Sequence, residues 1–531
     1  MQSARLLPLL AALVLRAVPA QSAPLTVPER SGHERTSTQT EVVQFLDALG
    51  GLPHAARLSR SIAGRSHEGR DIVVVRAALE DHRAPLRMLV IANIHAGEVE
   101  GKEAVQVLLR EVAQGMHEDL LRSCELHVVP VYNADGNERV KATNRAEQNG
   151  PVAGVGERAN GQGLDLNRDF VKSEAPETRA LLGLLASVDP HVFMDLHTTN
   201  GSFHGYHLTW APCLAPNMDP GLAAMSRTLL EDVCAGLQTA EPAFRTFDYG
   251  NFETRDWDGG GAPDSGGRRG WWTYDHRARY CVNGFGLRNR IGVLSEAYSY
   301  ADFATRIAAT RAFVLAVQGW VVRNRELVLE GIAAADALAA DPSRPISFGY
   351  ATTFAPPEEL DVLVGEVDRI PVPGTELVRL AMKDTFSPTR MPVARAFRAT
   401  RSVELPAAWV VPDPDPQFVA ALERHGIRTS RLGAARTVKA SAFAVTGKSK
   451  PKRPFQGHHE LVLKGAWLEI EDLELPAGTL WVDARQPLAR LAATLLAPES
   501  EDSLSTWNFL EDRTADRYPV LRILAAPTSK N

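Results

Sequence analysis

The sequence MLVIANIHAGE occupies residues 88–98 and runs from a dense apolar stretch into a histidine and a glutamate. The apolar part, residues 88–94, is rich in Val, Ile and Leu and lacks the polar alternation of a half-exposed strand, which is typical of a strand covered on both faces. Gly97 lets the backbone bend between His95 and Glu98. We therefore expect a buried strand with two metal-ligating residue types at its end.

Apolar runs of the same kind recur along the chain and alternate with helical stretches. Strands are expected at residues 72–77, 126–131, 192–196 and 291–294. Helices are expected at residues 102–112, 176–186 and 305–328. This alternation predicts an α/β fold, with a mostly parallel mixed sheet and helices on both faces.

The chain has 531 residues, which is long for a single domain. A capping box formed by Thr38 and Glu41 begins the α/β pattern, so we expect a catalytic domain at residues 38–335. A linker is expected at residues 336–345, which are rich in Ala and Asp and end in prolines. Short β-like runs then predict a β-rich C-terminal domain at residues 346–531. Residues 21–37 are polar and are expected to form a disordered lead-in.

The N-terminus carries a basic residue, Arg5, then an apolar run at residues 6–15 and small residues near Ala20. This pattern predicts a signal peptide at residues 1–20 and a secreted or periplasmic protein, with an uncleaved anchor as the alternative. No other stretch is long and apolar enough to predict a membrane span in the mature protein. Four cysteines could form up to two disulfides or remain as buried free thiols. The net charge of −6 gives no basic surface for nucleic acid.

Three residues at strand ends have the side chains of a metal site. His95 and Glu98 follow one expected strand, and His197 closes another. Two histidines and a glutamate form a known catalytic zinc set that leaves one position open for water, although another divalent metal could use the same ligands. Asp195 is a further candidate for metal contact or for orienting a ligand. The alternatives are a surface His–Glu pair and an ordinary core histidine.

Two further elements carry charge in places where charge is unusual. Glu296 ends an apolar strand, where a carboxylate is costly to bury without a function or a partner. A loop at residues 163–169 contains Asn167 and Arg168, which could grip a carboxylate through parallel hydrogen bonds. A structural salt bridge is the alternative in both cases.

The motifs HxxE, DxNR, a strand-final His and a strand-final Glu, in this order, resemble the zinc carboxypeptidase family over residues 38–335. Residues 62–70 are similar to the family's approach to its first core strands. Residues 133–136 are similar to its Asn-Pro-Asp-Gly turn. Residues 478–482 and 502–509 resemble the tail of bacterial peptidases related to this family.

The resemblance implies a hydrolase that releases C-terminal residues from a peptide substrate with a free C-terminus. It implies one Zn²⁺ per chain, held by His95, Glu98 and His197. In the family the catalytic base corresponds to Glu296, and water attacks the last peptide bond. The resemblance also implies that Asp165 is the partner of His95, and that Asn167 and Arg168 bind the substrate carboxylate. It further implies Arg145 or Arg158 as the oxyanion residue. Tyr274 or Tyr280 would cap the substrate. In the place where the oxyanion arginine is expected, this chain has Gln148.

Two other functions are compatible with the same motifs. One is an amidohydrolase of this fold that acts on peptidoglycan stem peptides or N-acyl amino acids. The other is a binding protein that has lost catalysis. A group of basic residues indicates either acidic substrates or a salt-bridged scaffold; its members are Arg277, Arg279, Arg288 and Arg290.

Overall fold

The computed structural model describes residues 23–199, 201–252 and 270–524. The signal peptide expected at residues 1–20 lies outside the described residues. Among the helices of the described ranges, none is both long and apolar enough to cross a bilayer.

An eight-stranded mixed sheet forms the centre of the N-terminal part, in the order β1-β2-β4-β3-β5-β9-β6-β7. Its core strands β4, β3, β5 and β9 are parallel. Their bounds are Cys124–Val129, Leu86–Ala92, Val192–Thr198 and Ile291–Ala297. The outer strands are β1 (Leu58–Arg65), β2 (Asp71–Ala77), β6 (Leu208–Pro212) and β7 (Thr246–Asp248). The predicted α/β class is confirmed.

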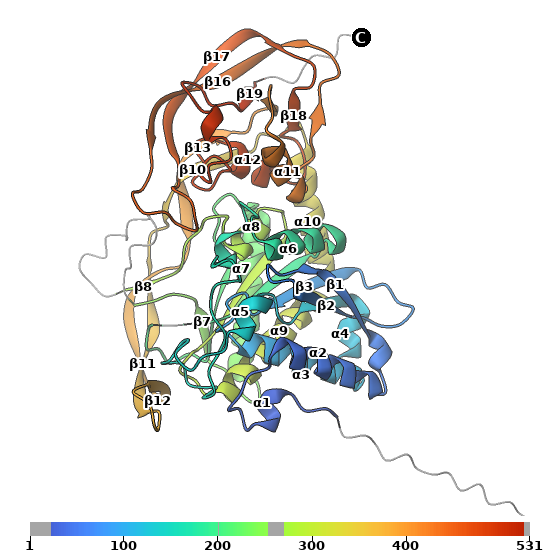
Figure 1. Cartoon of the computed structure of the whole chain (residues 1–531), viewed down its shortest axis with the longest axis vertical. Coiled ribbons are helices and arrows are strands. Elements are labelled where there is room, and N and C mark those ends of the chain that lie inside the picture. Colours follow the sequence, from blue (N-terminus) through green and yellow to red (C-terminus); the bar gives the residue numbers. More distant parts are fainter. Residues whose placement is uncertain (1–22, 200, 253–269, 525–531) are drawn as a thin grey trace, which may run out of the picture.

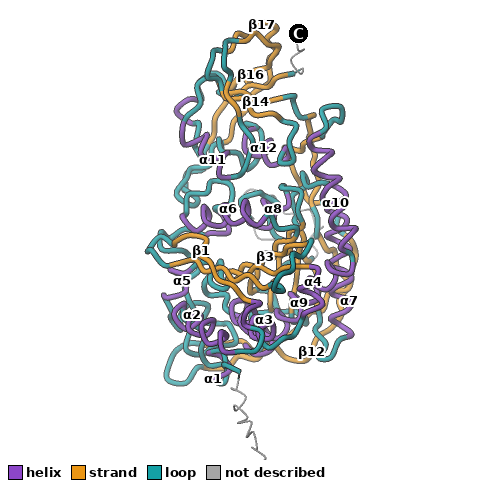
Figure 2. The backbone as a smooth tube through the Cα atoms, turned by 90° about the vertical axis from the view of Figure 1, so that its right-hand side faces the viewer, coloured by secondary structure: helices purple, strands orange, loops and turns teal. Residues whose placement is uncertain are grey.

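Alternate residues of β3 belong to two different cores, as the two-residue period of a strand requires. Met88 and Val90 lie in the core that α3 and α9 cover, whereas Leu89 and Ile91 lie in the core under α6 and α8. These helices span Glu100–Ala113, Phe303–Arg323, Pro176–Val188 and Cys281–Gly286. Figure 2 shows α6 and α8 on one side of the sheet, with α3 and α9 on the other. Further helices of this part are α2 (Gln39–Ala48), α4 (Glu118–Ser123), α5 (Ala134–Glu138) and α7 (Pro220–Thr239).

The predicted disordered lead-in is wrong for residues 23–37. A short helix, α1 (Val27–Arg30), begins there with a capping box of Thr26 and Glu29. The buried carboxylate of Glu103 accepts hydrogen bonds from Thr36 Oγ1 at 2.8 Å and from the Ser37 backbone at 2.7 Å. The polar composition is therefore used for buried hydrogen bonds that order this segment.

The predicted helix at residues 305–328 and the linker at residues 336–345 also need correction. The helix is interrupted at Asn324, and a second helix, α10, spans Arg325–Ala340. Ala335 and Ala339 of α10 are buried, so the Ala-rich stretch continues the packed structure instead of separating two domains. The next strand, β10, begins at Ser347.

The C-terminal region contains β10 to β19, including a six-stranded sheet in the order β15-β18-β14-β19-β16-β17. The strands span Ser347–Phe354, Glu358–Pro371, Val378–Ala394, Phe397–Glu404, Ala408–Val411, Ser430–Arg431, Arg436–Ser449, Val462–Leu475, Leu480–Asp483 and Leu521–Ile523, with α11 at Pro416–Arg424 and α12 at Ala489–Leu496. Strand β12 pairs in parallel with β8 (Trp271–Trp272), and Figure 1 shows the β11–β12 hairpin extending beside the N-terminal part. The two parts of the chain therefore share a sheet.

All four cysteines are buried with free thiols. The sequence left open whether they form disulfides or remain free, and in the structure they remain free.

Candidate active site

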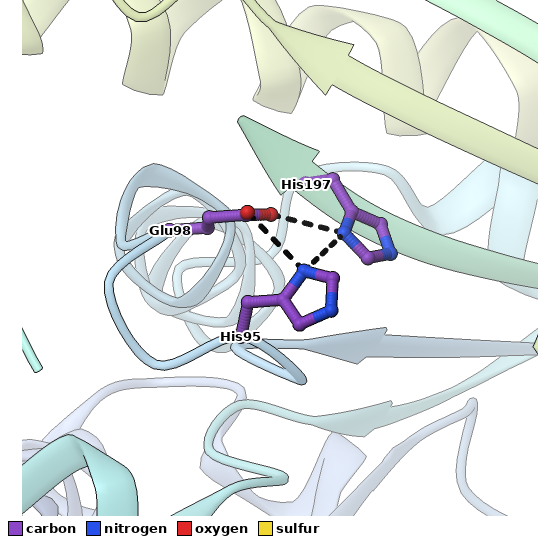
Figure 3. A group of neighbouring side chains, drawn as sticks. All are labelled: His95, Glu98 and His197. Carbon is purple, nitrogen blue, oxygen red and sulfur yellow. Dashed lines mark hydrogen bonds and ion pairs between the residues drawn. The ribbon is translucent and has the colours of Figure 1, made fainter. Parts of the chain in front are cut away.

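Three side chains at the carboxyl ends of β3 and β5 converge on one point (Figure 3). Glu98 Oε1 lies 3.2 Å from His95 Nδ1, and Glu98 Oε2 lies 2.9 Å from His197 Nδ1. The two Nδ1 atoms are 3.1 Å apart. The potential ligand atoms of these residues all lie within 4.8 Å of one another, and all three residues are buried. The structure thus brings together the residues that the sequence proposed as ligands.

Oppositely charged neighbours shift the pKa values of two residues of this cluster. Burial opposes charge on Glu98, yet His95 and Arg145 hold the pKa of Glu98 well below its usual range. Burial also opposes charge on His197, but Asp195 and Glu98 raise the pKa of His197 well above its usual value. Two imidazole nitrogens and a carboxylate are ligands that zinc uses in catalytic sites. The donor set therefore fits a zinc ion.

Each histidine has an acidic partner behind it. His95 Nε2 lies 3.1 Å from Asp165 Oδ1, and His197 Nε2 lies 2.9 Å from Asp195 Oδ2. A carboxylate at the far nitrogen selects the tautomer whose other nitrogen can bind a metal. Both of these orienting residues were candidates from the sequence.

Glu296 lies on the strand next to His197. In the parallel β5–β9 pair, His197 and Glu296 are partners in register, so both lie at the same edge of the sheet. Burial raises the pKa of Glu296 to about 8, with Glu98 acting in the same direction and His197 in the opposite one. Glu296 is therefore a buried carboxyl group beside a candidate ligand, and not a surface ion pair.

Two arginines lie beside Glu98. Arg145 Nη1 donates to Glu98 Oε1 at 3.0 Å, and Arg158 Nη1 lies 3.5 Å from the same oxygen. Arg158 also donates to Asp165 Oδ2 at 2.8 Å. Gln148, which stands where an arginine was expected, accepts a hydrogen bond from Arg145 Nε at 2.9 Å. The glutamine therefore supports Arg145.

Asn167 and Arg168 follow Asp165 in a short 3₁₀ turn, Leu166–Arg168. Asn167 Oδ1 accepts a hydrogen bond from the Cys281 amide at 2.9 Å. The guanidinium of Arg168 lies over the Tyr280 ring, 4.0 Å from its centroid. Because Asp165 connects this turn to His95, the turn lies next to the cluster of His95, Glu98 and His197.

Tyr249 is a further tyrosine beside the cluster, and the sequence did not indicate it. Tyr274 is buried, and its hydroxyl donates to Asn283 Oδ1 at 3.3 Å. Burial raises the pKa of both Tyr249 and Tyr274 well above the usual value, and Glu296 acts in the same direction on each. Tyr249 directly follows β7, which has only three residues and is too short for a periodic signal.

The basic group near residue 280 belongs to the scaffold. Each of these arginines has a partner within the protein: Arg277 pairs with Asp275, Arg279 with Glu460 and Asp502, Arg290 with Asp189 and Asp336, and Arg288 donates to the His425 carbonyl. These contacts support the scaffold alternative and give no support to acidic substrates.

Comparison with known proteins agrees with the motifs. A family model described as zinc carboxypeptidase matches residues 42–211, which include His95, Glu98 and His197. "Carboxypeptidase 2" of Trichophyton tonsurans is 23% identical over 473 residues, covering 82% of this chain and 76% of that protein. "Carboxypeptidase D" of Homo sapiens is 30% identical over 173 residues, covering 25% of this chain and 12% of that protein.

Among solved structures, the metallo-carboxypeptidase from Pseudomonas aeruginosa in complex with (2-guanidinoethylmercapto)succinic acid is 18% identical, with a TM-score of 0.41. That match covers 55% of this chain and 70% of the other. Residues 42–211 are therefore similar to the zinc carboxypeptidase family, and the family match together with the named relatives identifies the protein as a metallopeptidase.

Proposed function

We propose that the protein is a zinc-dependent metallocarboxypeptidase that hydrolyses the last peptide bond of peptides with a free C-terminus. The observation that carries this proposal is the position of the Asn167–Arg168 turn directly beside the His95, Glu98 and His197 cluster, connected through Asp165. A carboxylate site next to a hydrolytic metal site is what removal of a C-terminal residue requires.

His95, Glu98 and His197 would hold the zinc ion, one per chain. When bound, zinc supplies Lewis acidity and lowers the pKa of water towards neutrality. Asp165 keeps the His95 ring in the ligating tautomer through their hydrogen bond, and Asp195 places a negative charge 2.9 Å from His197 Nε2.

Glu296 is assigned as the general base. It takes a proton from the attacking water as the new C–O bond forms, and returns a proton to the amide nitrogen as the C–N bond breaks. Its buried position and its strand register beside His197 support this role. Arg145 and Arg158 are assigned to the negative charge that develops on the carbonyl oxygen, because both guanidinium groups lie at Glu98.

Arg168 and Asn167 are assigned to the terminal carboxylate of the substrate. The Arg168 side chain is only 15% exposed and rests on the Tyr280 ring, so its orientation is restricted. A pre-oriented guanidinium can bind a carboxylate through two parallel hydrogen bonds. Tyr249 packs beside Tyr274, with ring centroids 5.9 Å apart, and is assigned as the tyrosine that contacts substrate. Tyr274, whose hydroxyl is bonded to Asn283, is left as scaffold.

The test is a pair of peptides that differ only in a C-terminal carboxylate or amide. The free acid should be hydrolysed about 100-fold faster or more, because the amide leaves the buried guanidinium without a charged partner. Arg168→Met should remove most of this preference, while Arg65→Met, at an exposed position of the edge strand β1, should leave it unchanged. Equal rates on both peptides, or cleavage within the chain, would contradict the carboxypeptidase assignment. Cleavage of stem peptides or N-acyl amino acids alone would favour the amidohydrolase.

A further inference from the structure

A tight turn of the C-terminal region, formed by Phe455, Gln456, Gly457 and His458, reaches the DxNR motif. Gln456 Oε1 accepts a hydrogen bond from the backbone amide of Asp165 at 2.8 Å. The two residues are 291 positions apart in the sequence. This contact connects the C-terminal region to the residue that stands behind the ligand His95.

Asp165 contacts several residues of the candidate site at once. Its Oδ1 lies 3.1 Å from His95 Nε2 and accepts a hydrogen bond from the Asn167 amide at 2.9 Å. Its Oδ2 accepts from Arg158 Nε at 3.0 Å and Nη2 at 2.8 Å. A shift of the Asp165 backbone would therefore disturb three contacts together. These are the contacts with the candidate ligand His95, with the Asn167 amide and with Arg158, a candidate oxyanion arginine.

The backbone of the turn explains how a glutamine reaches this position. The Phe455 and His458 backbones exchange hydrogen bonds of 2.7 and 3.0 Å, and φ is +49° at Gln456 and +83° at Gly457. Glycine adopts positive φ readily, but a glutamine there is uncommon and Asn would be favoured. The chain thus has a long amide side chain at a position where the backbone alone would favour the shorter one.

Charged contacts hold the turn on the N-terminal part. His458 Nε2 lies 3.0 Å from the Glu174 carboxylate. Two residues after His458, Glu460 accepts a hydrogen bond from Arg279 Nη2 at 2.7 Å. Arg279 is completely buried, and its guanidinium lies 4.6 Å from the centroid of the Trp507 ring. His458 and Glu460 therefore fix the chain after Gln456, and before it the guanidinium of Arg279 lies 5.5 Å from the centroid of the Phe455 ring.

We propose that Gln456 is a positioning residue of the active site, and that the C-terminal region thereby supplies part of the support for the metal ligand His95 and for the carboxylate turn. This inference rests on the proposed function for its kinetic consequences. Its effect on zinc affinity does not rest on the proposed function, because that effect arises only from how the ligand residues of the chain are held.

Three substitutions at Gln456 distinguish the loss of the hydrogen bond to Asp165, which needs a long side chain, from a failure to form the turn. Gln456→Asn suits the positive φ but is one methylene shorter, so it should keep the turn and lose the hydrogen bond to Asp165. Gln456→Ala loses the bond as well, whereas Gln456→Glu keeps both the length and the acceptor. Lys452→Ala is the control, because Lys452 is exposed on the same loop.

Each variant is measured for zinc affinity by competition with a chelator, for kcat/KM on a free-acid peptide, and for its melting temperature. Gln456→Asn should weaken zinc binding and lower kcat/KM by about two- to tenfold, the effect of one hydrogen bond, with a melting temperature within about 2 °C of wild type. Gln456→Glu should restore both values to within about twofold of wild type.

Wild-type zinc affinity and kcat/KM in Gln456→Asn would overturn the proposal. Equal losses in Gln456→Asn and Gln456→Glu would overturn it too. If wild-type protein binds zinc but cleaves no peptide, the proposed function fails, and the zinc affinities of the same variants still decide the role of Gln456.

Discussion

Replacing Arg306 with methionine should destabilise the protein by about 3–5 kcal/mol, the range for breaking a buried ion pair. Arg306 is completely buried in α9, and its Nε lies 3.4 Å from the buried carboxylate of Glu100. Its other nitrogens donate to four backbone carbonyls at 2.7–3.1 Å. These carbonyls belong to Asn149, Gly150, Ser299 and Ala301, in two loops beside the candidate active site.

The magnitude follows from what the substitution leaves behind. Methionine fills much of the volume but leaves Glu100 without its cation and the carbonyls without a donor, and each lost hydrogen bond to a charged donor is worth about 1.5–3 kcal/mol without adding fully. Relief of the arginine's own burial offsets part of this loss, because burial lowers the pKa of Arg306 to about 10 despite Glu100. The double variant Arg306→Met with Glu100→Gln removes both charges, so it should recover about 1–2 kcal/mol.

Urea unfolding of the wild type, the two single variants and the double variant gives the four free energies of this cycle. Hydrogen exchange at residues 299–301 should increase most in Arg306→Met. A loss below about 1 kcal/mol in Arg306→Met would refute the argument that this buried pair holds the loops. Strict additivity of the two single substitutions would refute the coupling between Arg306 and Glu100.

Two further predictions concern the acidic partners of histidines. Asp195→Asn should weaken zinc binding by about 10-fold, because the carboxylate behind His197 Nε2 is lost; an unchanged zinc dissociation constant in chelator competition would contradict that role. The hydrogen bond with Glu174 raises the pKa of His458 above its usual 6.5. The stabilisation is therefore present below pH 6.5 and is lost as the pH rises through the higher folded-state value. His458→Gln should lower the unfolding free energy by at most about 1 kcal/mol at pH 5.5 and by less at pH 8.5, and the opposite order would disprove this sign.

The elements that carry the candidate metal site could be predicted because each depends on a local pattern. The apolar runs of β3, β5 and β9 are buried along their whole length, and His95, His197 and Glu296 lie at or just beyond their carboxyl ends. Parallel strands bring their carboxyl ends to one edge, so residues about 100 positions apart meet there without any further signal.

The parts that the sequence did not predict depend on contacts between distant segments. The lead-in was expected to be disordered because its polar residues show no local partner, whereas Glu103 binds them from α3. The resemblance implied Tyr274 or Tyr280 as the capping residue, but the Tyr274 hydroxyl is bonded to Asn283. A Gln-Gly pair indicates a turn, yet nothing local indicates that Gln456 reaches Asp165.

The most direct test of the central claim combines metal analysis with peptide digestion, on wild type and Glu296→Gln. Wild type should contain about one zinc per chain and trim single residues from the C-termini of a mixed peptide library. Glu296→Gln should keep the zinc, because its side chain is not a ligand, and lose about 1,000-fold or more of the activity. Trimming that persists in Glu296→Gln, or wild-type activity without bound metal, would contradict the account.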